Sequence, residues 1–147
     1  MKNAVALFLV LITLACSPFR QTSFTYNNAG QTFSLPVIVP KGFSKQTNYS
    51  DSLGNQIHTF DYKDGAFYYL AFVADTNTFI QPVDTSIHFP QILSSGAKGF
   101  KSADSTFKFW REVHNKNLRA GYRYVYGDAE FIFDSASTHF GMMPREK

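Results

Sequence analysis

Residues 57–73 read IHTFDYKDGAFYYLAFV, and this stretch decides the fold class. Two aromatic-rich arms flank Asp64-Gly65, the dipeptide most favoured in the two-residue turn of a β-hairpin. That turn places Tyr62 directly opposite Phe67. The second arm is apolar on both faces, which is typical of a central strand that is covered on both sides. We therefore expect an antiparallel sheet with helices packed against it.

Turn chemistry predicts another hairpin N-terminal to this stretch. It pairs Ser23–Tyr26 with Thr32–Val39 around Asn27–Gly30. Pro36 and Pro40 cannot donate hydrogen bonds to a strand ladder, so the second arm belongs at an edge of a sheet or at a bulge.

A third hairpin is expected C-terminal to the central one. It joins Thr106–Val113 to Leu118–Tyr126 in a register that pairs Val113 with Leu118. The same register sets Glu112 opposite Arg119, where the two side chains form a cross-strand ion pair.

The last element is expected to be a helix. Asp128 is a suitable N-cap, and apolar residues recur at helical spacing as far as Phe140. Gly141 fits the position just after a helix, and Pro144 lies beyond it. The run Phe131–Phe133 also fits a strand, but the agreement of the two end signals favours the helix.

These elements predict an α+β fold with one mostly antiparallel sheet built from three hairpins and packed with the C-terminal helix. One further short helix is expected at Pro90–Gly96, opened by a proline in its first turn. The predicted organisation is a signal peptide (1–15), a lipidated N-terminus and tether (16–22), a single globular domain (23–141) and a C-terminal tail (142–147).

Composition excludes several classes of protein. The chain has 147 residues, enough for one domain, and its content of 44% hydrophobic and 17% aromatic residues excludes a disordered segment. A net charge of +3 without a run of Lys or Arg argues against a nucleic-acid partner. The single cysteine excludes an internal disulfide and a thiolate zinc site.

The beginning of the chain has the pattern of an export signal. Lys2 gives a positive start, and the apolar run Ala4–Leu14 is shorter than the ~20 residues of a membrane span. Thr13-Leu14-Ala15-Cys16 resembles the lipobox of bacterial lipoproteins, in which a signal peptidase cuts before the cysteine and the sulfur carries a diacylglyceryl group. Acylation needs a thiol at the new N-terminus, and Cys16 supplies it.

Ordinary secretory cleavage after Ala15 is the alternative, because Thr13 stands where the lipobox usually has leucine. The only cysteine of the chain falls at the position that lipidation requires, which favours the lipoprotein. Several acyl chains on one residue suffice for stable anchoring. We therefore expect a domain that is lipid-anchored to a bacterial membrane in the cell envelope, on its periplasmic or surface-facing side.

Six different short motifs are spread along the expected mature chain: Gly30–Phe33, Pro40–Phe43, Phe60–Gly65, Trp110–Glu112, Gly121-Tyr122 and Phe133-Asp134. In these motifs the chain resembles a family of uncharacterised small lipoproteins common in the Bacteroidetes. The resemblance implies an exported lipoprotein with an antiparallel sheet and packed helices, similar to the Mog1/PsbP-type α/β sandwich. It implies no activity and no functional residues.

Residue patterns that carry catalysis are sparse. No two of the histidines His58, His88, His114 and His139 have the spacing of a local metal site. The sequence has neither a GxSxG nucleophile elbow nor a phosphate-binding glycine loop. We therefore expect no catalytic residues, metal or cofactor. A hydrolase whose site is assembled only in three dimensions remains an alternative, since such a site leaves no local pattern.

The outer face of the third hairpin is a candidate interaction face, formed by Lys108, Trp110, Arg119 and Arg123. In the expected register Lys108 faces Arg123 and Trp110 lies over Gly121. Like charges placed opposite each other are destabilising, so this pair requires water, a counter-ion or an acidic partner. An ordinary solvated surface is the simpler interpretation.

The expected function is that of a membrane-anchored envelope lipoprotein acting as a non-enzymatic binding or assembly module. The alternative is a carrier of a small apolar ligand, held between sheet and helix by Phe and Tyr. A pocket of about 300 Å³ or more would favour the carrier. The expected partners are the membrane, through the N-terminal lipid, and an envelope protein or anionic lipid headgroups at the interaction face. We expect no nucleic-acid partner.

Overall fold

The computed structural model describes residues 17–81, 89–92, 98–103 and 108–143. Within these ranges the chain forms nine strands and one helix. The strands are β1 (Phe19–Asn28), β2 (Gln31–Pro40), β3 (Phe43–Ser50), β4 (Gln56–Tyr62), β5 (Phe67–Phe72), β6 (Phe89–Ile92), β7 (Lys98–Ala103), β8 (Lys108–Asn115) and β9 (Leu118–Tyr126), and the helix is α2 (Glu130–Gly141).

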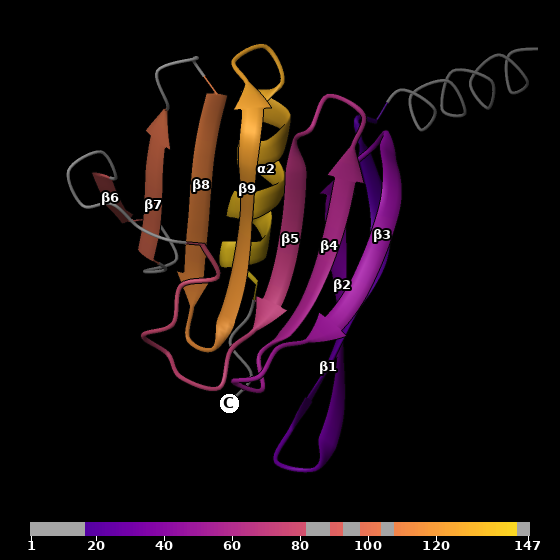
Figure 1. Ribbon diagram of the computed structural model, residues 1–147, viewed down its shortest axis with the longest axis vertical. Coiled ribbons are helices and arrows are strands. Elements are labelled where there is room, and N and C mark those ends of the chain that lie inside the picture. The colour runs from indigo at the N-terminus through magenta and orange to yellow at the C-terminus, as the bar shows by residue number, and fades with distance from the viewer. Residues whose placement is uncertain (1–16, 82–88, 93–97, 104–107, 144–147) are drawn as a thin grey trace, which may run out of the picture.

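Seven strands form one antiparallel sheet in the order β3-β4-β5-β9-β8-β7-β6, while β1 and β2 form a separate two-stranded sheet. The β1–β2 hairpin and α2 lie next to each other on the same side of the large sheet (Figure 1). The hairpin is attached to the large sheet through Gln56. The side chain of Gln56 accepts a hydrogen bond from the Asn27 amide at 2.8 Å and donates one to the Asn27 carbonyl at 2.7 Å.

The expectation of a mostly antiparallel α+β fold with a C-terminal helix is confirmed. The expectation of one sheet built from three hairpins is wrong. The first hairpin lies outside the large sheet, which also contains the unexpected strands β3, β6 and β7. The prediction of a short helix at 90–96 is also wrong for residues 90–92, which belong to strand β6. The rest of that segment lies outside the described residues.

The first hairpin starts earlier than expected. Strand β1 begins at Phe19, so residues 19–22, which the sequence assigned to a tether, belong to the strand. Its turn is the pair Ala29-Gly30, whose backbone φ angles are 49° and 79°. Because β1 and β2 pair only with each other, both are edge strands, which agrees with the presence of Pro36 and Pro40.

The central hairpin has a register that differs by one residue from the expected one. Asp61 pairs with Phe67, and Phe60 pairs with Tyr68. The turn has three residues instead of two, and Gly65 adopts a φ of 86°, the left-handed conformation that closes such a loop. Since side chains alternate across a strand, this slip moves Tyr68 to the face that packs under α2 and Tyr69 to the opposite face.

The register of the third hairpin differs from the expected one by two residues. Its turn is Lys116-Asn117, which pairs Asn115 with Leu118 and Glu112 with Gly121. The register changes again at a bulge between Phe109 and Arg111, where Tyr124 has a φ of 60°. The expected pairs Lys108–Arg123, Trp110–Gly121 and Glu112–Arg119 therefore do not exist as direct cross-strand partners.

The main core lies between the large sheet, the β1–β2 hairpin and α2. Its largest members are aromatic: Phe24, Tyr26, Phe60, Tyr68, Phe72, Tyr122, Phe133 and Phe140. The rings make a connected series of contacts; for example, Tyr26 stacks on Phe72 with 4.7 Å between ring centroids. The high aromatic content of the sequence is thus largely accounted for by this core.

Helix α2 is fixed to the sheet by polar contacts as well as apolar ones. Its buried side is lined by Phe133, Ala136 and Phe140. Arg111 on β8 pairs with the Asp134 carboxylate at 3.2 Å and donates a hydrogen bond to the Thr138 hydroxyl at 2.9 Å. The strand alternative for Phe131–Phe133 is wrong, because residues 130–141 form a helix. Both expected ends are one residue off: the N-cap is Ala129 rather than Asp128 and has no side-chain hydrogen bond, and Gly141 is the last helical residue rather than the one after it.

Candidate functional site

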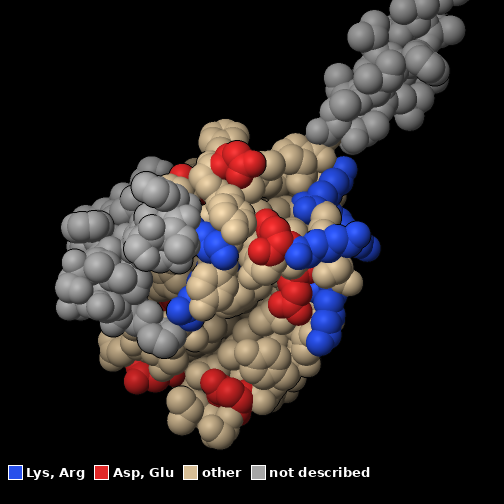
Figure 2. Space-filling model, turned by 45° about the horizontal axis from the view of Figure 1, so that its top comes forward, with Lys and Arg blue, Asp and Glu red and all other residues tan. Residues whose placement is uncertain are grey.

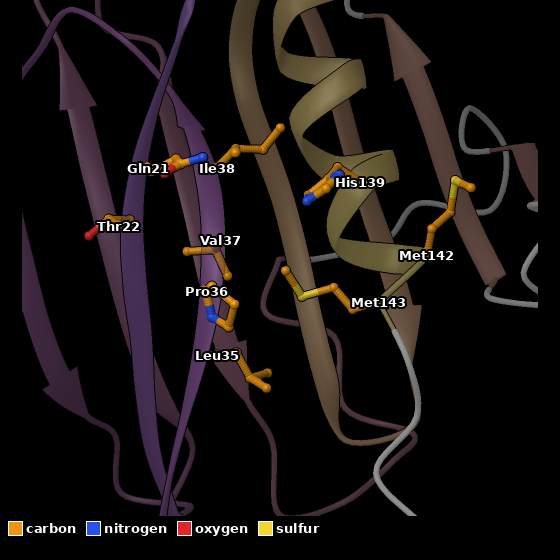
Figure 3. A pocket seen from close by; sticks show the side chains of 9 residues that line it. All are labelled: Gln21, Thr22, Leu35, Pro36, Val37, Ile38, His139, Met142 and Met143. Carbon is orange, nitrogen blue, oxygen red and sulfur yellow. The ribbon is translucent and has the colours of Figure 1, made fainter.

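An apolar groove separates the β1–β2 hairpin from the C-terminal half of α2. Its volume is about 980 Å³. The residues that line it come from both sides: Gln21, Thr22, Leu35, Pro36, Val37 and Ile38 from the hairpin, and His139, Met142 and Met143 from the helix and the residues after it (Figure 3). Small-molecule sites in proteins are mostly apolar and measure about 300–1,000 Å³, and the groove agrees with both properties.

The topology creates this groove. The hairpin and α2 cover neighbouring parts of one sheet face, and contacts between α2 and β2 hold them side by side. In β2, Val37 is buried in the core while Ile38 remains half-exposed in the wall of the groove. At the other wall the helix ends, and Met142 is 54% exposed. The flexible, polarisable side chains of Met142 and Met143 can adapt to the shape of an occupant.

The polar groups of the groove lie toward one end of it. Gln21 on β1 and His139 on α2 lie on its two sides at the level of Ile38, and Thr22 follows Gln21 along β1. Leu35 and Met143 form the apolar end (Figure 3). This arrangement suits a ligand with an apolar chain and one polar end. No pattern in the sequence marks His139 as part of a site, because the groove brings it together with residues that are distant along the chain.

A smaller pocket of about 510 Å³ lies on the other side of the C-terminal turn of the helix. It shares His139 and Met142 with the groove and is otherwise lined by Arg111, Phe131, Asp134, Ser135 and Thr138. The charges of Arg111 and Asp134 are already paired with each other. Asp134 also accepts a hydrogen bond from the Tyr122 hydroxyl at 2.5 Å, and burial, followed by the charge of Asp134, raises the pKa of Tyr122. These residues hold the helix in place.

The opposite face of the sheet contains a buried polar cluster around Glu112. Its carboxylate accepts hydrogen bonds from the Tyr69 hydroxyl at 2.5 Å and from the Ile80 amide at 3.2 Å, and it contacts the His114 ring at 2.6 Å. Glu112 is fully buried, and burial raises the pKa of Tyr69. Since both carboxylate oxygens are engaged inside the protein, the cluster fixes the segment around Ile80 to the sheet.

Arg119 belongs to this buried cluster rather than to an exposed face. Its side chain is fully buried, and its guanidinium group donates hydrogen bonds to the backbone carbonyls of Thr76, Thr78, Lys116 and Leu118. Burial lowers its pKa from the usual value, while the nearby Glu112 acts in the opposite direction. The expected contact between Arg119 and Glu112 is present at 3.9 Å, although the two residues are not direct cross-strand partners.

The candidate interaction face is therefore divided. Trp110 is buried, with 5% of its surface exposed, and Arg119 is fully buried. Lys108 and Arg123 are half-buried and come together through Tyr124, at 5.9 Å and 4.6 Å from the centre of its ring. Lys108 lies closer still to the Tyr126 ring, at 5.0 Å from its centre. Two of the four predicted residues thus share a cation–aromatic site, and the other two belong to the interior.

Other predicted features lie partly outside the described residues. Cys16 and the export signal are among the residues that the structure does not describe, as is His88. The half-buried His58 packs against Phe24, with 4.8 Å between the rings. Among the described residues, no group of three or more His, Cys, Asp or Glu side chains has a metal-binding arrangement.

Comparisons of the chain with protein-family models, with curated proteins and with solved structures found no match. No helix within the described part of the chain has both the length and the apolar composition needed to cross a membrane.

Proposed function

We propose that this protein is a membrane-anchored envelope lipoprotein whose domain binds a small apolar ligand in the groove between β2 and α2. The observation that carries the proposal is the groove itself, with a volume of about 980 Å³ and walls made mainly of aliphatic and methionine side chains. Attachment to the membrane rests on the lipobox-like sequence around Cys16.

The groove supports a carrier more strongly than an assembly module. A volume of this size is above the ~300 Å³ at which drug-sized ligands begin to fit. The ligand site is not the aromatic one expected from the sequence, because the large rings fill the core and the groove is lined by Leu35, Val37, Ile38 and the two methionines. Apolar side chains supply most of the binding free energy, at about 25 cal/mol per Å² of apolar surface removed from water.

A single-chain lipid is the ligand class that fits this wall chemistry best. An acyl chain would occupy the part formed by Leu35, Val37 and Met143, and a polar end group would lie near Gln21 and His139. Both residues can donate hydrogen bonds to a carboxylate or a hydroxyl. The proposed role is binding and release, and it requires no chemical step.

The direct test is a titration of the full chain with a fluorescent fatty acid, and its displacement by an unlabelled fatty acid. We expect saturable binding at one site. Ile38→Asp introduces a charge into the apolar wall and should raise the Kd at least about tenfold, since an unpaired carboxylate is costly to remove from water.

Leu53→Asp is the matched control, because Leu53 is 72% exposed in the turn between β3 and β4 and does not line the groove. It should leave the Kd unchanged. Circular dichroism should show that both variants are folded. Non-saturable binding, or an equal effect of the two substitutions, would show that the groove is not the ligand site.

A further inference from the structure

Basic side chains surround the point at which the described chain begins. The backbone amide of Lys41, in the turn after β2, donates a hydrogen bond to the Pro18 carbonyl at 2.9 Å. Arg20 is the second residue of β1, and its guanidinium group lies 5.4 Å from the centre of the Phe43 ring. Arg20 and Lys41 therefore both lie next to the first described residues.

Two more lysines extend this group across the neighbouring strands. Phe43 pairs with Tyr62, and Lys45 pairs with Asp61 on the same two strands. Lys63 directly follows Tyr62 in the turn between β4 and β5. We call the four exposed residues Arg20, Lys41, Lys45 and Lys63 the tether corner.

Figure 2 shows Lys and Arg side chains gathered on the side of the molecule where the chain begins, with acidic side chains between them. The acidic residues at the tether corner are Asp61 and Asp64, which leaves an excess of two positive charges. The opposite end of the same strands differs. Outside the buried cluster of Arg119 and Glu112, its described charged residues are Asp51, Asp75 and Lys116, with an excess of one negative charge.

We propose that the tether corner rests on an anionic bilayer surface. The proposal depends on the membrane attachment of the proposed function, because the attached residues lie N-terminal to Ser17 and thus adjacent to this corner. Each basic residue near such a surface strengthens the binding of a protein to the membrane about fivefold. Charges act over about 10 Å at moderate salt, so only residues held close to the membrane contribute. Two net charges are too few to recruit a free protein, but they suffice to orient a tethered one.

This orientation would bring the ligand groove close to the membrane. Gln21 and Ile38, which line the groove, pair with each other one step along the hairpin from the Arg20–Val39 pair. At about 3.3 Å per residue of strand, Ile38 is roughly 10 Å from Lys41 along the chain. A lipid leaving the bilayer at the tether corner would therefore have a short path to the groove.

Hydrogen exchange of the full chain attached to vesicles tests the proposal. The attachment is made by the acyl chains at Cys16 that the proposed function requires. On phosphatidylglycerol vesicles the amides of residues 41–42 and 63–65 should exchange up to about tenfold more slowly than on phosphatidylcholine vesicles, and the difference should disappear at high salt. Amides of the turns at 29–30 and 116–117 should show no difference.

Lys63→Glu and Lys116→Glu form a matched pair of charge reversals, because both lysines are exposed in hairpin turns at opposite ends of the sheet. Lys63→Glu should reduce the slowing to less than about twofold, and Lys116→Glu should preserve it. Equal exchange on both kinds of vesicle, or slowing at residues 116–117 instead, would overturn the proposal. Lys63→Glu should leave fatty-acid binding unchanged and Ile38→Asp should leave the slowing unchanged, so this proposal and the ligand site can fail independently.

Discussion

Gly121 occupies a tightly enclosed position in the large sheet. It lies in the middle of β9 and pairs with Glu112 on one side and Tyr69 on the other. A Cβ atom at this position would collide with the Tyr69 hydroxyl and with the backbone carbonyl of Arg111. The missing side chain is what allows Tyr69 to reach across β9 to the Glu112 carboxylate.

We expect Gly121→Ala to lower the free energy of unfolding by about 1–3 kcal/mol, the usual cost of overpacking, because the backbone carbonyl cannot move aside without breaking the strand pairing. Gly127→Ala is the control, since a Cβ there would only touch Phe109 at 3.4 Å. That substitution should change the stability by no more than about 0.5 kcal/mol. Urea unfolding measures both, and equal stabilities of the two variants would contradict the packing argument.

His58 connects the β1–β2 hairpin to the large sheet, since its ring meets the edge of Phe24. Burial lowers the pKa of His58 below its usual value, and a hydrogen bond with the backbone of Thr25 opposes this only in part. The neutral ring is therefore the form that the folded protein favours.

Acidification should destabilise the protein through His58. Because its pKa is lower in the folded state than the ~6.5 of the unfolded chain, the unfolded chain binds more protons between these two values. The contribution of the neutral His58 to the free energy of unfolding is therefore fully present above about pH 6.5. It is lost as the pH falls from there toward the folded pKa. His58→Gln cannot titrate and should show a smaller loss between pH 7.5 and 5.5 in urea unfolding. An equal loss in both proteins would assign the pH dependence to other groups.

At the level of elements, the sequence predicts which segments pair but not how they are aligned. The three strand pairs and the C-terminal helix were recognisable from turn residues and apolar spacing. The registers were not, because Asp64-Gly65 fits both a two-residue turn and the three-residue loop that forms. In the third hairpin the shorter turn Lys116-Asn117 and the bulge at Tyr124 add two further shifts.

Strand β3 was missed because its sequence, FSKQTNYS, is polar and mostly exposed, as an edge strand permits. Such a strand lacks the apolar alternation by which half-buried strands are recognised. The same limitation applies to the candidate interaction face. A register error changes the partners of every side chain, and Arg119 was placed at the surface although it lies under the segment that contains Thr76 and Thr78.

The ligand groove could not be predicted from any one segment. It arises because the β1–β2 hairpin and α2 pack on the same face of the large sheet and leave a space between them. The aromatic residues that suggested an apolar ligand are the ones that fill the core. The residues that line the groove are ordinary strand and helix-end residues, and only the packing of distant segments gives them a common role.

At the scale of the whole molecule, the proposed function joins a ligand groove to a membrane attachment at one end of the domain. Strand β1 begins at Phe19, only three residues after Cys16, so an acylated Cys16 would hold the domain close to the bilayer. At most ~3.6 Å per extended residue, this link spans about 11 Å. A short link restricts the orientations of the domain and keeps the tether corner within the range of membrane charges.

Acylation of Cys16 is therefore the prediction on which membrane attachment depends. Bacterial cells that express the protein should incorporate a fatty-acid analogue into the wild-type chain and into Ser17→Ala, a control next to the modified residue. Cys16→Ala should incorporate none, because the sulfur is the atom that is alkylated and no other cysteine can replace it. The Cys16→Ala chain should also leave the membrane fraction once its signal is removed, since a domain with two excess charges at the tether corner binds a membrane only weakly. Equal labelling of Cys16→Ala and the wild type would show that the chain is not a lipoprotein of this kind, and ordinary cleavage after Ala15 would then leave the domain without a membrane anchor.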